Sequence, residues 1–117
     1  MNTTRQFLSV VHVALLAIGL ALVAGPVQAE DGKTLYRAQC KSCHDVGSPN
    51  GEYTPMDLIQ DQWQRFFDRK YERTHKGVVD PTSGKPVTET ISPEDLELIK
   101  EFAIEGAADS EHPMTCG

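Results

Sequence analysis

The spacing of apolar residues divides the chain into an apolar leader and a helical remainder. Residues 7–24 are almost continuously apolar. Farther on, apolar residues recur at three- and four-residue steps from Met56 to about His75 and again after Ser92, which predicts two amphipathic helices. A shorter helix is predicted over residues 32–39, where good helix formers follow a glycine. The apolar positions of the two longer helices are Leu58, Ile59, Trp63, Phe66, Phe67 and Tyr71, then Leu96, Leu98, Ile99, Phe102 and Ala103.

Turn-forming residues set the limits of these helices. Glycine, proline, serine and asparagine are dense over residues 45–56 and 76–91, which predicts two loops. Ser92 is placed to cap the last helix, with Pro93 at its first position, and Gly106 is placed to end it. A tail follows from residue 107. The pattern therefore predicts an all-α domain with about three main helices.

The leader has the features of a secretory signal peptide. Arg5 precedes the apolar run, and Val27 and Ala29 form a small-residue cleavage pattern before Glu30. Residues 1–29 are therefore predicted to be a signal peptide and residues 30–117 the exported domain, in the periplasm. An uncleaved membrane anchor is the alternative, because an 18-residue apolar run can just span a bilayer.

Composition narrows the class of partner. Removing residues 1–29 takes away a single charged side chain, Arg5, so the remaining 88 residues carry 10 Lys and Arg, 17 Asp and Glu, and a net charge of −7. An acidic surface disfavours nucleic acid as a partner. A domain of this size buries a modest core and commonly relies on a metal, disulfide or cofactor for stability.

The most specific motif is Cys-Lys-Ser-Cys-His at residues 40–44. This C-x-x-C-H run is the attachment signature of haem c, in which both thiols form thioethers with one porphyrin and the histidine binds its iron. It predicts one covalent haem held by Cys40, Cys43 and His44. The alternatives are a redox-active cysteine pair, a structural disulfide or half of a zinc site. The first needs a βαβ context and the last a second pair of ligands, and the sequence has neither.

The order of these parts resembles that of class I cytochrome c, the small monohaem electron carriers. The resemblance covers nearly all of residues 30–117, although only the pentapeptide is specific. It implies that the first and last helices cross, with Leu35 or Tyr36 against Ile99 or Phe102. It also implies a carrier of single electrons, free or as the haem subunit of an oxidoreductase. Such a carrier is not an enzyme, and it docks briefly with redox protein partners.

The sixth iron ligand departs from this family pattern. The family usually takes it from a methionine before the last helix, and residues 76–92 contain none. His75 is the favoured candidate, because it extends the aromatic stripe and lies where the loop begins. Met114 and Met56 are alternatives, and His112 and Cys116 are weaker ones. Two histidines would give a lower potential than histidine with methionine.

A second class of function remains open at this point. The missing loop methionine and the unpaired Cys116 would also suit a haem-based sensor of small ligands, or an enzyme acting on sulfur compounds, with a vacant or weakly held sixth iron position. No acid–base group of residues accompanies the motif, so the carrier hypothesis is favoured.

Overall fold

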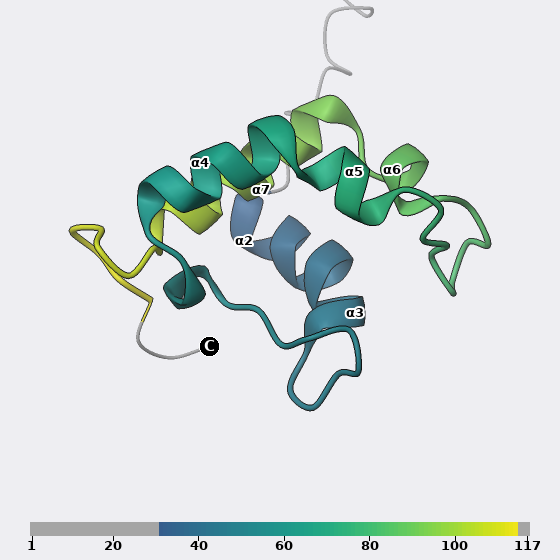
Figure 1. The fold of residues 1–117 in the computed structure, drawn as a ribbon, viewed down its shortest axis with the longest axis horizontal. Coiled ribbons are helices and arrows are strands. Elements are labelled where there is room, and N and C mark those ends of the chain that lie inside the picture. The colour runs from purple at the N-terminus through teal and green to yellow at the C-terminus, as the bar shows by residue number, and fades with distance from the viewer. Residues whose placement is uncertain (1–30, 115–117) are drawn as a thin grey trace, which may run out of the picture.

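The computed structural model describes residues 31–114, and these residues form a helical domain (Figure 1). Within that range no β-strand occurs, and extended pairing is limited to an isolated antiparallel bridge between Val79 and Pro86. The prediction of an all-α domain is confirmed to this extent. The predicted signal peptide and Cys116 lie outside the described residues. Between residues 31 and 114 no helix is long and apolar enough to cross a membrane.

The first helical stretch is longer than the sequence predicts. It runs without interruption through α2 (Gly32–Leu35), a π-helical turn η1 (Tyr36–Cys40) and α3 (Lys41–His44). The Asp31 side chain accepts a hydrogen bond from the Thr34 N–H at 2.8 Å and so caps its start. The entire C-x-x-C-H motif therefore lies at the C-terminal end of this stretch.

The predicted helix over residues 56–75 is divided in the structure. A short 3-10 turn η2 (Pro55–Asp57) comes first, then α4 (Gln60–Arg69) and α5 (Tyr71–His75). Leu58 and Ile59 are extended, and the Gln62 side chain accepts a hydrogen bond from the Ile59 N–H at 3.1 Å, which fixes the start of α4. Lys70 has φ −117°, so α5 changes direction after α4.

The last helix begins and ends where the sequence predicts. In α7 (Pro93–Glu105), the Ser92 hydroxyl accepts a hydrogen bond from the Asp95 N–H at 3.1 Å, and Pro93 takes the first position. Gly106 follows the helix, but with φ −90° it is not left-handed. Glycine is required there for another reason: a Cβ would lie 2.9 Å from the Pro55 Cβ. The loop before α7 also contains a short helix, α6 (Val87–Thr90), which the sequence analysis missed.

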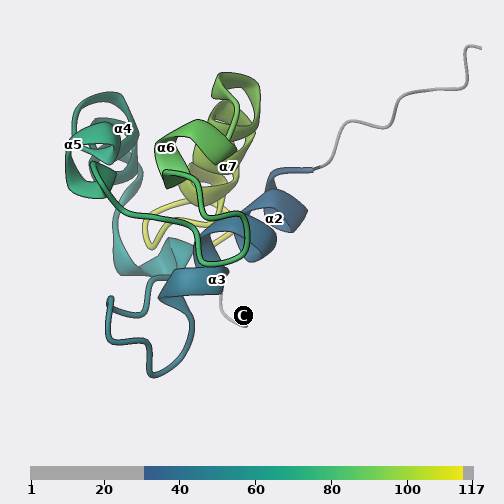
Figure 2. The same cartoon turned by 90° about the vertical axis from the view of Figure 1, so that its right-hand side faces the viewer.

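Two small clusters form the core on either side of α7. In the first, Leu35 and Tyr36 pack with Ile99, and the Tyr36 and Phe102 rings lie 5.4 Å apart. In the second, Trp63 packs with Ala103 and Ala107. The α2 and α4 helices thus pack against the same helix, as Figures 1 and 2 show. The predicted contact of the first and last helices is confirmed.

Candidate functional site

His44 stands at the end of α3 with its ring orientation fixed by the loop that follows. Its Nδ1 lies 3.0 Å from the Gly51 carbonyl oxygen. Because a carbonyl only accepts, Nδ1 carries the hydrogen and Nε2 keeps its lone pair. The Tyr53 ring packs edge-on against the imidazole at 5.1 Å, and the Tyr53 N–H donates to the His44 carbonyl at 3.3 Å. The loop over residues 45–54 therefore orients His44, whose Nε2 makes no hydrogen bond within residues 31–114.

The His75 ring is held in the same way at the end of another helix. It is the last residue of α5, and its Nδ1 lies 2.9 Å from the Tyr71 carbonyl oxygen and 3.1 Å from the Thr74 hydroxyl. Its Nδ1 therefore donates to the Tyr71 carbonyl, which again leaves Nε2 as the available lone pair. A histidine that binds a metal commonly donates its other ring N–H to a carbonyl in this manner.

The two imidazoles meet although 31 positions separate them in the sequence. Their ring centroids lie 6.1 Å apart and their planes are inclined by 85°. Aromatic rings lie beside His75: the half-buried Phe66 is 6.3 Å from it and the buried Tyr71 is 4.7 Å from it. The sequence analysis placed these aromatic residues on a helix face, and the structure turns part of that face toward His44.

The two thiols of the motif have different surroundings. Cys40 packs against the core cluster of Leu35, Tyr36 and Ile99. Burial raises the pKa of its thiol to about 12, and the Cys43 charge adds to this. Cys43 instead borders a cleft of about 200 Å³ between the first helical stretch and the loop before α7. Neither His44 nor His75 lines this cleft, so of the candidate haem-binding residues the cleft contacts Cys43.

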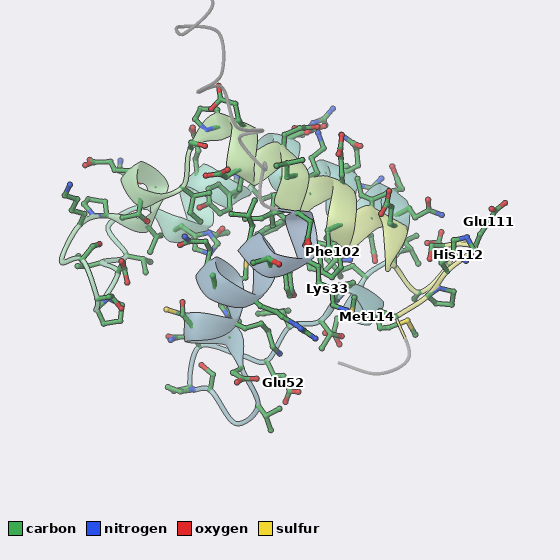
Figure 3. All side chains as sticks on the ribbon, turned by 180° about the vertical axis from the view of Figure 1, so that it is seen from behind. Lys33, Glu52, Phe102, Glu111, His112 and Met114 are labelled. Carbon is green, nitrogen blue, oxygen red and sulfur yellow. The ribbon has the colours of Figure 1, made fainter. Side chains whose placement is uncertain are left out.

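The alternative iron ligands lie elsewhere in the fold. Met114 donates its backbone N–H to the Gly106 carbonyl at 3.1 Å, so it sits at the end of α7 (Figure 3). His112 is exposed in the same tail. Met56 belongs to η2, which packs against α7. Of the candidates within residues 31–114, His75 is the one that the structure brings to His44.

Sequence reasoning missed the residues that orient the site. Gly51 has φ +88°, a conformation that other residues rarely adopt, and this places its carbonyl against His44. Tyr53 links the loop to the first helix, because its carbonyl accepts the Tyr36 hydroxyl at 2.8 Å. The Asn50-Gly51 pair was a turn signal, but nothing in the sequence tells which side chain the turn would serve.

Metal binding by side chains alone has no support in residues 31–114, where no group of three or more His, Cys, Asp or Glu side chains is arranged around a common point. A haem makes a smaller demand, because the porphyrin supplies the in-plane ligands and the protein only the axial ones. His44 and His75, whose Nδ1 atoms donate to carbonyls, and the cysteines at the end of the first helical stretch are the residues that would fit such a group.

Comparison with known proteins gives a different relationship from the one expected. No family model matches the chain, and no solved structure matches it. A curated protein, the ATP-dependent Clp protease adapter protein ClpS of Salmonella arizonae, is 32% identical to it over 76 residues. These residues make up 64% of this chain and 72% of that protein.

This finding overturns the expected family and function. The resemblance to class I cytochrome c, the role of single-electron carrier and the description as an electron-transfer protein are wrong on this comparison. The alternative of a haem-based sensor or sulfur-compound enzyme gains no support from it either. The physical reason is that only residues 40–44 were specific, whereas the order of helices is shared by many small α-proteins. The relative is 32% identical to this chain, and the match covers 72% of its length. The chain therefore belongs to the family of the Clp protease adapter protein ClpS.

Proposed function

We propose that the chain holds one covalently bound haem c, with thioethers to Cys40 and Cys43 and with His44 and His75 as the axial ligands of the iron. The observation that carries this proposal is the approach of the two imidazoles to 6.1 Å. A metal–imidazole bond is about 2 Å long, so the spacing of the two rings would leave room for one bound ion between them.

The surrounding residues also suit this group. Both Nδ1 atoms donate to carbonyls, which keeps both Nε2 atoms available as ligands. Each thiol can add across a vinyl group, forming one carbon–sulfur bond and passing its hydrogen to the other vinyl carbon, so no oxidant is consumed. When bound, the haem would supply an iron whose properties depend on its two histidines. In this proposal α2, α4, α5 and α7 are the helices folded around it.

Export belongs to the same proposal. Residues 1–29 have the pattern of a signal peptide, and haem is attached to such motifs outside the cytoplasmic membrane. We propose a periplasmic location on these two grounds.

Replacing His75 with alanine is expected to change the spectrum of the holoprotein without releasing its haem. The thioethers remain, but one strong-field ligand is lost, so a low-spin spectrum gives way to a high-spin or ligand-exchangeable one. Absorption spectra of the oxidised and reduced holoprotein measure this. His112→Ala is the matched control, because that histidine is exposed in the tail. An unchanged spectrum in His75→Ala would rule out His75 as a ligand.

The similarity to ClpS supports a second candidate function. We propose that the chain acts by binding protein partners and is not itself an enzyme, because the relative is described as an adapter protein. The similarity supports protein partners in general.

Addition of the purified chain to an ATP-dependent Clp protease is expected to change the rate at which the protease degrades a protein substrate. Gel-based degradation assays measure the rate, and sedimentation measures association with the protease. An unrelated protein of similar size and net charge is the control for charge effects. Absence of both association and a rate change would exclude the adapter role.

A further inference from the structure

A hydrogen bond from a core residue fixes the loop over residues 45–54. Tyr36 is 5% exposed, and its ring packs against α7, 5.4 Å from the Phe102 ring. Its hydroxyl donates to the Tyr53 carbonyl oxygen at 2.8 Å, although 17 positions separate the two residues. Within the described part of the chain, the other polar contacts of this loop reach no farther than four residues beyond its ends. The Tyr36 hydroxyl therefore ties the loop to the core.

The same loop carries the hydrogen-bond acceptor of His44. The His44 Nδ1 donates to the Gly51 carbonyl at 3.0 Å. Two residues later, the Tyr53 N–H donates to the His44 carbonyl at 3.3 Å, and the two rings lie 5.1 Å apart. Tyr53 thus contacts His44 through its N–H and ring, and its carbonyl accepts the bond from the core.

His75 differs from His44 in this respect. Its Nδ1 donates to the Tyr71 carbonyl, which belongs to the same helix, α5. The His75 ring is therefore oriented by its own helix, whereas the His44 ring is oriented by a loop that must be held in place. Surface loops are more mobile than the elements they connect, so the hold on this loop decides how firmly His44 is oriented.

We infer that Tyr36 is a positioning residue of the proposed haem site, whose hydroxyl holds the 45–54 loop so that the Gly51 carbonyl remains on His44 Nδ1. This inference rests on the proposed function. The carbonyl that accepts from a ligating histidine fixes its ring orientation and raises its basicity as a ligand. The Tyr36 hydroxyl acts through the loop and makes no contact with the iron itself.

The test compares Tyr36→Phe with the wild type in the reduced, low-spin holoprotein. Phenylalanine keeps the ring that packs against α7 and removes only the hydroxyl. Proton NMR measures the rate at which the Nδ1 hydrogens of His44 and His75 exchange with water. We expect the His44 hydrogen to exchange about tenfold faster in Tyr36→Phe, the factor that corresponds to loss of one hydrogen bond. The His75 hydrogen should keep its rate.

Ser92→Ala is the matched control for lost stability. It also removes one side-chain hydrogen bond, the cap of α7, and lies outside the proposed site. An unchanged rate for His44 in Tyr36→Phe would overturn the inference alone. Equal acceleration of both histidines, or the same acceleration of His44 in Ser92→Ala, would overturn it as well, because the effect would then be one of general stability. A wild-type chain without covalent haem would overturn the proposed function and the inference with it.

Discussion

Replacing both Cys40 and Cys43 with alanine is expected to abolish covalent haem attachment. Single variants should each keep one thioether and give a reduced yield of holoprotein. The Cys40 change should be the more damaging, because Cys40 also packs against the core cluster and Cys43 borders a cleft. Haem staining after denaturing electrophoresis detects the covalent fraction, and the intact mass gives its stoichiometry.

The control for this experiment lies inside the motif. Ser42 is exposed between the two cysteines, and its hydroxyl donates to the Gln39 carbonyl at 2.8 Å. Ser42→Ala should therefore load normally. The same mass measurement shows whether residues 1–29 have been removed, because a cleaved holoprotein has the mass of residues 30–117 plus one haem. Equal haem content in the wild type and the double variant would refute thioether attachment.

Gly32→Ala is expected to destabilise the domain by about 3 kcal/mol or more, the upper range for overpacking. A Cβ at Gly32 would clash with the Leu98 carbonyl oxygen and lie 2.9 Å from the Phe102 Cβ. Because the nearest contact is backbone of α7, no side-chain rotation can relieve it. The greater helix propensity of alanine, about 0.5–1 kcal/mol, offsets only part of this cost. Guanidinium unfolding followed by circular dichroism measures the change.

Gly84→Ala provides the comparison for this prediction. Gly84 has φ +69°, but a Cβ there would meet nothing within 4 Å. Its replacement should cost only the strain of a left-handed alanine, on the order of 1 kcal/mol. If Gly32→Ala proves no more costly than Gly84→Ala, the close crossing of α2 and α7 is not a main source of stability.

The sequence was sufficient to predict the local ends of the last helix but not those of the middle one. Ser92 and Pro93 act on their own neighbours, so their effect can be read from adjacent residues. The predicted middle helix is interrupted at Leu58–Ile59, where the backbone is extended, and again at Lys70. These interruptions accompany the packing of α4 against α7. Tertiary packing of this kind cannot be predicted from the spacing of apolar residues along the chain.

The candidate site was predictable in part for the same reason. Cys40, Cys43 and His44 are contiguous, so their common chemistry is visible in the sequence. His75 could be selected only as one histidine near the start of a loop, because its approach to His44 depends on the fold. The role of Gly51 depends on the direction of its backbone carbonyl, which residue type alone does not reveal.

The π-helical turn at Tyr36–Cys40 is the point in the first helical stretch where a one-residue change of length is best tolerated. An ordinary α-helix advances by about 100° per residue, and a π turn accommodates one additional residue without ending the helix. Tyr36 is the first residue of this turn and packs against Phe102 of α7, Cys40 is its last residue, and Cys43 follows in α3. Loss of one residue between positions 36 and 40 would therefore convert this segment to ordinary α-helix and keep the residues on either side in register. Loss of one residue from α2 or α3, which have no such extra residue, would rotate the part of the stretch that follows it by about 100° relative to the core.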